Sequence, residues 1–362
     1  MGLHISIPVV QNDTGADFYF RELERGLISS GARTSLQFFD RKYEASSRWL
    51  GWAYRCPDDA DVVHTKAEHG FALRTGGRPL VMTLAHSVFD PLIARHKSTS
   101  ASLYHQLVVR DRIRRSLERA DAVVTVSEHS RARIAEDFGY ASAIRIYNGV
   151  DERRFRPLEE SERTFRDRWD RNRFKLLYVG NAMKRKGADL LAPILRELGS
   201  QFVLYYTSGL RGRGLPSPTP NMIPLGRLSD DELVAAYAEC DALLFPSRME
   251  GFGYPIAEAM ACGKPVVTTN ASSMPELVED GKGGRLCAVD DVQAFAAAIR
   301  ELAGLGAQER EAMGARNRRR VIERFTHARF AAEHAALYER LAAARVRSDA
   351  RPHAPRALNA HA

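Results

Sequence analysis

Cysteine is scarce in this chain of 362 residues, and the few that are present lie far apart. A disulfide framework or a zinc site needs cysteines at suitable spacing, and no C-x-x-C pair occurs. The scattered pattern is typical of a reducing compartment, so we expect the protein in the cytoplasm. The cysteines are Cys56, Cys240, Cys262 and Cys287.

Long apolar runs are missing as well. No stretch approaches the roughly 18 apolar residues that a membrane-spanning helix needs. The first residues, MGLHISIPVV, lack the basic flank and long apolar run of a signal peptide. We therefore expect a soluble protein, at most peripheral at the inner face of the plasma membrane.

Several cofactor and nucleic-acid motifs are also absent. Without a G-x-G-x-x-G segment, a nicotinamide-binding first domain is not expected. No D-x-D pair stands in a metal-binding context, so we expect no metal and no other cofactor. The net charge of +8 and pI near 9.4 favour an acidic partner: nucleic acid, anionic lipid or a phosphorylated small molecule. A nucleic-acid-binding protein remains an alternative by charge alone, but its motifs are missing and we expect no nucleic acid.

Short apolar runs alternate with amphipathic segments, which predicts an α/β protein with parallel sheets. We expect strands at residues 4–9, 34–39, 61–64, 80–84, 122–126 and 143–147 in the first half, and at 175–179, 202–206, 222–224, 242–245 and 265–268 in the second. Expected helices include 17–29, 103–119, the segment between Ser127 and Gly139, 188–198, 230–239, 255–262 and 291–303.

A polar, arginine-rich stretch at 151–173 separates the two halves and places a domain boundary near Pro157. Two such domains would place a cleft between the carboxyl ends of their strands, where parallel sheets bind ligands. We expect one Rossmann-like domain over 1–156, a second over 157–325, a helix over 326–347 and a disordered basic tail over 348–362.

The most informative segment is the loop that follows the strand at 242–245. A glycine-containing loop leads into a helix with Pro255 at its first position, where a missing N–H group costs little. Gly253 and Tyr254 are weak side-chain caps, so the first-turn N–H groups could hold a phosphate. Glu250 and Glu258 flank this place, and because carboxylates repel a diphosphate, their natural partners are a sugar and a ribose. Taken singly, each residue fits a plain turn or dipole role as well.

As one block, however, E-G-F-G-Y-P-I-A-E-A-M-A-C-G-K-P-V-V resembles the signature of the retaining GT-B glycosyltransferases of family 4. Glu250 and Glu258 realise its E-x7-E spacing. The segments RLSDDELVAAYAECDALLFPS, ADAVVTVSEHSRARI, IYNGVDERRFRP and FTHARFAAEHAALYERL are similar to the same family, and the likeness covers most of residues 1–346.

The resemblance implies an α/β GT-B fold, with two Rossmann-like domains whose parallel sheets face a central cleft. The first domain would lie on the acceptor side, and the helix at 326–347 would cross back onto it. In the second domain, Glu258 would bind the ribose hydroxyls and Glu250 the hydroxyls of the transferred sugar. The other donor contacts would come from Gly251, Phe252 and Gly253 beside the sugar and diphosphate, and from Leu225 and Gly226 near the base.

A basic loop follows the strand at 175–179. Three adjacent basic residues are usually a solvated surface, but these stand at the carboxyl end of a strand, where ligands bind. The resemblance implies that Gly180 lines the donor site and that Lys186 neutralises the departing diphosphate. The family usually has an arginine directly after this glycine, whereas this chain has Asn181. One diphosphate contact is therefore missing, or is replaced by Lys184 or Arg185.

Three further positions lie in the first domain. Gly15 precedes the first helix and retains one glycine of a pair that the family often has near the donor. His86 follows the strand at 80–84, in a segment that resembles the one whose histidine contacts the donor sugar. His64 is a possible neighbour in the cleft, although lone histidines are more often structural. We expect Ser127 to cap a helix.

We therefore expect a metal-independent, retaining hexosyltransferase with His86, Glu250 and Lys186 as its catalytic residues. It would move a sugar from a nucleoside-diphosphate-sugar donor to a glycan or lipid-linked acceptor hydroxyl, in bacterial polysaccharide, lipopolysaccharide or glycolipid synthesis. The alternative is a non-catalytic or differently acting GT-B relative, such as a nucleotide-sugar-binding protein or an epimerase. We also expect the five arginines of residues 106–119 to lie either in a solvated face or against anionic lipid or a phosphorylated carrier.

Overall fold

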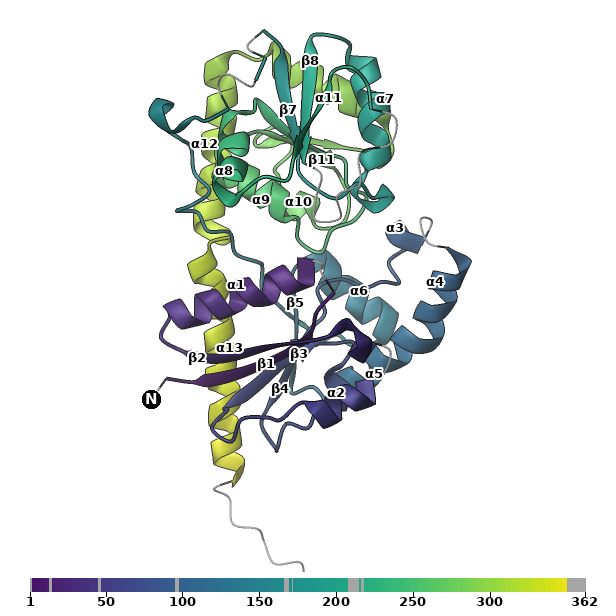
Figure 1. Cartoon of the computed structure of the whole chain (residues 1–362), viewed down its shortest axis with the longest axis vertical. Coiled ribbons are helices and arrows are strands. Elements are labelled where there is room, and N and C mark those ends of the chain that lie inside the picture. The colour runs from purple at the N-terminus through teal and green to yellow at the C-terminus, as the bar shows by residue number, and fades with distance from the viewer. Residues whose placement is uncertain are drawn as a thin grey trace, which may run out of the picture.

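The structure is a computed structural model that describes residues 2–349, apart from 13–14, 45–46, 95–97, 166–168, 171, 208–214 and 216–217. It has two lobes stacked along the long axis, with α12 and α13 running beside them (Figure 1). Residues 350–362 of the expected tail lie outside the described residues, and residues 348–349 end α13 instead.

The first lobe contains a six-stranded sheet in the order β2-β1-β3-β4-β5-β6, and all of its paired strands are parallel. The strands are β1 (His4–Val10), β2 (Arg33–Phe39), β3 (Val62–Lys66), β4 (Leu80–Thr83), β5 (Ala122–Thr125) and β6 (Ile144–Arg145). The helices are α1 (Gly15–Ser29), α2 (Ser47–Ala53), α3 (Pro91–Ala94), α4 (Thr99–Tyr104), α5 (Arg110–Leu117) and α6 (Glu128–Phe138), with single turns η1 (Arg41–Glu44) and η2 (Gly70–Ala72) and a π-helix η3 (His105–Val109).

The second lobe repeats this plan with a parallel sheet in the order β12-β11-β10-β7-β8-β9. Its strands are β7 (Phe174–Tyr178), β8 (Phe202–Thr207), β9 (Met222–Gly226), β10 (Ala242–Phe245), β11 (Val266–Thr269) and β12 (Gly284–Cys287). Its helices are α7 (Ala188–Leu198), α8 (Asp230–Glu239), α9 (Tyr254–Ala261), α10 (Met274–Leu277), α11 (Val292–Gly304) and α12 (Ala307–Arg324), with turns η4 (Glu160–Glu162) and η5 (Lys184–Lys186).

The expected strands and helices are present, two of them with changed bounds, and the structure adds elements that were not expected. The strand expected at 143–147 shortens to β6, because it lies at the sheet edge and pairs only through two residues with β5. The helix expected at 103–119 begins earlier, at Thr99, and contains the π-helix η3. Four short elements were not expected: the helices α2, α3 and α10, and the strand β12, whose GRLC sequence shows no clear apolar alternation.

The chain crosses between the lobes near the end of α12. Val150, in the first lobe, bonds through its N–H to the Phe325 carbonyl at 2.8 Å and accepts from His327 N–H at 3.0 Å. The last helix, α13 (His327–Asp349), then packs against α1 of the first lobe (Figure 1). None of the helices in the described ranges is long and apolar enough to cross a membrane.

Candidate active site

The loop between β10 and α9 lies at the carboxyl edge of the second sheet. Gly253 precedes α9 with φ of 103°, a left-handed conformation that favours glycine, and no side chain caps the helix. The Gly253 carbonyl accepts from the N–H groups of Ile256 (3.0 Å) and Ala257 (3.2 Å). The first-turn donors expected to hold phosphate are therefore partly used, because the helix starts one residue before Pro255.

Glu250 is a buried carboxylate held by two cations. Its Oε1 accepts from Lys186 Nζ at 2.7 Å and lies 3.5 Å from an Arg185 guanidinium nitrogen. Ser247 Oγ donates to the same oxygen at 2.7 Å. Burial would raise the pKa of Glu250, but Lys186 and Arg185 outweigh it, so the pKa is lowered and the carboxylate is charged.

Glu258 is equally buried but has a different electrostatic environment. It lies on α9, and its Oε2 accepts a hydrogen bond from the Tyr237 hydroxyl at 2.7 Å. Burial raises the pKa of Glu258 to about 7, because the neighbouring hydroxyl and the distant Arg154 stabilise the charge too weakly. The two glutamates therefore differ near neutral pH: Glu250 is ionised, whereas Glu258 is partly protonated.

A glycine fixes the basic loop against the glutamate loop. Gly187 ends η5 with φ of 68°, and a Cβ atom there would lie 2.0 Å from the Pro246 carbonyl oxygen. The backbone of Arg248 donates to the Arg185 carbonyl at 2.9 Å. This close approach of two loops carries Lys186 to Glu250, which lies 64 positions further along the chain.

His86 stands where the first lobe meets this site. Gly251 packs so closely on the loop after β4 that a Cβ atom would lie 2.6 Å from the Ala85 carbonyl oxygen. Burial, together with the positive charge of Arg185, lowers the pKa of His86 to about 4. The structure therefore brings His86 beside the Glu250 loop as a neutral imidazole.

Two family patterns match the chain, one in each half. Glycosyltransferase Family 4 matches residues 14–154, and Glycosyl transferases group 1 matches residues 173–304. The MMP alpha-(1->4)-mannosyltransferase of Mycolicibacterium hassiacum is 30% identical over 306 residues, which cover 78% of this chain and 71% of that protein. The chain belongs to glycosyltransferase family 4.

Other relatives of this family 4 glycosyltransferase match over a shorter length. The GDP-mannose-dependent alpha-(1-6)-phosphatidylinositol monomannoside mannosyltransferase of Mycolicibacterium smegmatis is 31% identical over 220 residues, so the match spans about half of each protein (54% and 56%). Among solved structures, sucrose-phosphate synthase from Thermosynechococcus elongatus has a TM-score of 0.76 at 19% identity, covering 94% of this chain and 99% of that one. Anabaena HepE with UDP and glucose has a TM-score of 0.74 at 19% identity, covering 92% and 99%. These likenesses and the two parallel sheets confirm the GT-B fold.

The basic loop of this family 4 glycosyltransferase departs from the family at Asn181, and the structure distinguishes the two suggested replacements. The Asn181 side-chain oxygen is buried without a hydrogen-bond partner, while its backbone oxygen accepts from the Tyr178 hydroxyl at 3.0 Å. Lys184 is exposed. Burial opposes a low pKa of Asp189, but Arg248 lowers that pKa, and the charge of Lys184 adds a smaller effect there. Arg185, by contrast, faces Glu250. Of these two residues, Arg185 is therefore the one that lies beside Glu250.

Of the other positions expected to bind the donor, Gly180, Leu225 and Gly226 lie at or near strand ends, and Gly15 lies at the start of a helix. Gly180 follows β7 and donates its N–H to Thr207 Oγ1 at 3.3 Å. Gly226 ends β9 with φ of 73°, and the preceding Leu225 is half-buried. Gly15 begins α1, and a Cβ atom there would meet nothing within 4 Å. The Phe252 side chain is buried against Tyr254, so its contribution to a ligand would come from the backbone.

The structure contradicts the suggested cleft position of His64. Its ring lies within β3, bonded to the Tyr338 hydroxyl (2.6 Å) and Thr83 Oγ1 (2.7 Å), and stacks on His334. Burial keeps its pKa well below the usual value. His64 therefore anchors α13 to the first sheet. Ser127 caps α6 as expected, since its Oγ accepts from Ser130 N–H at 3.1 Å.

Two supporting residues were missed in the sequence. Arg248 is buried and bonds Asp189 (2.7 Å) and Asp290 (2.6 Å), which braces the glutamate loop. Glu276 lies on α10 of the second lobe, yet its carboxylate accepts from the backbone N–H groups at the start of α6, those of Glu128 (2.8 Å) and His129 (2.9 Å). This contact links the lobes at a helix N-terminus. The partners of Arg248 and Glu276 lie far away in the sequence, so no pattern of neighbouring residues indicates these contacts.

The arginines of residues 106–119 mostly contact the protein itself. Arg110 stacks on Phe89 and donates to the Asp137 carbonyl, and Arg112 donates to the Glu44 carbonyl. The exposed Arg114 is the exception. Arg115 lies over the Phe71 ring, and Arg119 donates to the Phe71 and Leu73 carbonyls. Arg114, Arg115 and Arg119 nevertheless remain exposed at the surface.

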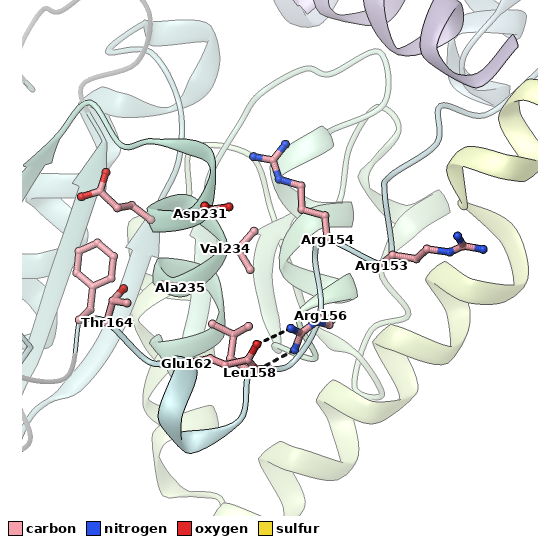
Figure 2. Close-up of a pocket in the computed structure, with 11 residues that line it drawn as sticks. Arg153, Arg154, Arg156, Leu158, Glu162, Thr164, Asp231, Val234 and Ala235 are labelled. Carbon is pink, nitrogen blue, oxygen red and sulfur yellow. Dashed lines mark hydrogen bonds and ion pairs between the residues drawn. The ribbon is translucent and has the colours of Figure 1, made fainter. Parts of the chain in front are cut away.

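A pocket of about 450 Å³ lies away from the glutamate loops, between the interlobe linker and α8 (Figure 2). Arg156 and Glu162 form an ion pair at the wall of this pocket, and the Arg154 side chain points away from that pair (Figure 2). Its lining includes none of the residues expected to bind the donor. Across the described part of the chain, no group of three or more His, Cys, Asp or Glu side chains could hold a metal ion.

Proposed function

We propose that this protein is a retaining glycosyltransferase that moves a hexose from a nucleoside-diphosphate-sugar to an acceptor hydroxyl. The observation that carries the proposal is the cluster in which Glu250 binds Lys186 and Arg185 while Glu258 lies on the next helix. Cations neutralise a diphosphate, and buried carboxylates accept hydrogen bonds from hydroxyls. Both requirements of a nucleotide-sugar donor are met in one place.

The donor would lie along the carboxyl edge of the second sheet. Glu258 accepts the ribose hydroxyls, and Leu225 and Gly226 approach the base. Glu250 accepts hydroxyls of the transferred sugar, beside the backbone of Gly251, Phe252 and Gly253. The neutral His86 donates to the sugar from the first lobe, where Gly15 and the loop after β1 complete the acceptor side. Gly180 and Asn181 line the diphosphate.

In the reaction, the bond between the anomeric carbon and the diphosphate oxygen breaks, and a bond to the acceptor oxygen forms on the same face of the sugar. The departing phosphate oxygen takes the acceptor proton, so no protein nucleophile is required. Lys186 and Arg185 stabilise the growing negative charge, an effect worth several kcal/mol at other enzyme sites. Because these cations supply the neutralisation, we propose catalysis without a divalent metal or other cofactor.

The donor and setting are proposed from relatives. The M. smegmatis relative is named as GDP-mannose-dependent, and HepE has been solved with UDP-glucose, so GDP-mannose and UDP-glucose are the first donors to test. Another relative is an O-antigen chain mannosyltransferase of Escherichia coli. We propose a glycan or lipid-linked acceptor in bacterial glycan synthesis, with the enzyme in the cytoplasm and peripheral at the membrane.

The decisive experiment is a thermal-shift panel of UDP, GDP, ADP and their hexose conjugates. A ligand at 100 times its Kd stabilises the fold by about 2.7 kcal/mol, which is easily measured. Glu258→Ala should weaken the shift, and Glu136→Ala, which removes an exposed carboxylate from α6, should not. No shift with any nucleotide would refute the proposal.

Product analysis then separates transfer from the alternatives. With the donor that binds, an enzyme should release the nucleoside diphosphate and form an α-glycoside with retained configuration, visible by NMR. Activity should survive EDTA. Formation of an epimer of the donor, or donor binding without any turnover, would instead support the epimerase or the nucleotide-sugar-binding protein. Asn181 is then the first residue to examine.

A further inference from the structure

Helix α2 exposes the largest apolar side chains of the chain to solvent. Trp49 is 63% exposed and Trp52 is 71% exposed, whereas the third tryptophan, Trp169, is only 6% exposed. The opposite side of the helix is buried through Leu50 and Gly51. Burying a large apolar side chain is worth roughly 1.5–3 kcal/mol, so two adjacent exposed indole rings call for a partner.

Packing fixes the direction in which these rings point. A Cβ atom at Gly51 would lie 2.0 Å from the Ala72 carbonyl oxygen, so α2 lies directly on the backbone of η2. Just after the helix, the Tyr54 hydroxyl bonds Ser6 Oγ at 2.8 Å inside the first sheet. The helix cannot roll inward without breaking these contacts, and the indole rings remain outside.

Basic residues flank the two rings. Arg48 and Arg55 are exposed at either side of the tryptophans, and Arg41 and Lys42 are exposed in the preceding turn η1. The sequence has no acidic residue between Glu44 and Asp58, and Glu44 is engaged by Asn12 and Arg41. We call the set Arg48, Trp49, Trp52 and Arg55 the tryptophan face.

We propose that the tryptophan face binds the surface of an anionic lipid bilayer. Indole rings concentrate at the membrane interface because they are apolar with one polar N–H group, and arginines add attraction to anionic headgroups. This combination supplies the two signals that stable peripheral binding requires. A purely apolar protein partner would leave the flanking arginines unpaired.

The distribution of other exposed apolar residues agrees with this orientation. Besides Trp49 and Trp52, five of the eight exposed large apolar side chains in the described chain precede residue 108 and therefore lie on the first lobe. Leu103, Tyr104 and Leu107 are exposed on the helical stretch of α4 and η3 and form a second group there. Holding the first lobe at the bilayer would bring the cleft to a lipid-linked acceptor, a consequence that rests on the proposed function.

The test is sedimentation of the full chain with vesicles of phosphatidylcholine alone and of phosphatidylcholine mixed with phosphatidylglycerol. The wild type should bind the anionic vesicles, and binding should fall at least about tenfold in Trp49→Ser/Trp52→Ser and in Arg48→Ser/Arg55→Ser. The matched control is Ile322→Ser/Val346→Ser, which removes exposed apolar side chains of α12 and α13 and should bind like the wild type.

Tryptophan fluorescence provides a second readout. Emission should shift to the blue when anionic vesicles are added, and this shift should vanish in Trp49→Ser/Trp52→Ser, which keeps only the buried Trp169. Both tryptophan substitutions change exposed side chains, so thermal unfolding and nucleotide-induced stabilisation should match the wild type. That nucleotide assay distinguishes failure of this proposal from failure of the proposed transferase function.

Three results would overturn the proposal. The first is absence of wild-type binding to anionic vesicles. The second is undiminished binding by Trp49→Ser/Trp52→Ser. The third is a wild-type dimer in sedimentation velocity that the same variant loses, without any vesicle binding, which would assign the tryptophan face to a second copy of the chain.

Discussion

The affinity for a nucleotide should depend on the protonation of Glu258. Burial raises the pKa of this carboxyl group from 4.5 to about 7 in the free protein. At pH 8 roughly nine in ten such groups are ionised, and at pH 6 roughly one in ten. A ribose hydroxyl that donates to the carboxylate favours the ionised form. Nucleotide binding must therefore release a proton at low pH, and the Kd should rise about tenfold from pH 8 to pH 6, or about 1.4 kcal/mol.

The carboxyl group of Glu250 and the imidazole of His86 do not titrate in this window. The pKa of Glu250 is lowered, and that of His86 is about 4, so both keep one charge state between pH 6 and pH 8. The terminal phosphate of the nucleotide does titrate near pH 6, and it affects every variant equally. Glu258→Gln, which cannot ionise, therefore isolates the contribution of the carboxyl group.

The assay is isothermal titration calorimetry of the tightest-binding nucleoside diphosphate at pH 6, 7 and 8. From pH 8 to pH 6, the Kd of the wild type should rise about tenfold more than the Kd of Glu258→Gln. The wild type should also release a proton on binding, which titrations in two buffers of different ionisation enthalpy will detect. Parallel pH profiles for the two proteins would refute the reasoning. They would show either that Glu258 is already ionised or that it does not contact the ribose.

The same raised pKa predicts a stability effect in the absence of ligand. The folded protein binds this proton more tightly than the unfolded chain does, so the contribution of Glu258 is fully present below pH 4.5 and is lost as pH rises through about 7. At pH 8, Glu258→Gln should therefore raise the free energy of unfolding, by at most roughly 3 kcal/mol. Urea unfolding at pH 5 and pH 8 measures the difference, which should shrink at the lower pH.

Three further predictions concern the loops and the lobes. Arg185→Gln and Lys186→Gln should each lower kcat by about 10²-fold in a nucleotide-release assay, whereas Lys184→Gln should change it less than twofold, because only the first two face Glu250. Glu276→Ala removes the acceptor for two N–H groups at the start of α6 and should increase the radius of gyration in X-ray scattering and raise the donor KM. Gly187→Ala places a Cβ atom 2.0 Å from a carbonyl oxygen at a positive φ, and should reduce the free energy of unfolding by about 1–3 kcal/mol in urea titrations.

Much of the fold follows from local pattern. The strand, glycine loop and helix around Glu250 were predicted within one residue, because Pro255 and Gly263 mark the helix ends in the sequence itself. The edge strands were harder. β6 and β12 depend on pairing with a neighbouring strand, and their own sequences carry little apolar alternation.

The sequence by itself determined the alternation of strands and helices, the two glutamates at E-x7-E spacing and membership of family 4. These properties depend on residues close together along the chain. Only the tertiary structure decided that Lys186 and Arg185 share one oxygen of Glu250 and that His64 packs on α13. It also decided that four arginines of 106–119 contact the protein itself, while Trp49 and Trp52 are exposed. Charge states and exposure depend on burial and on contacts between distant segments, and a linear pattern contains neither.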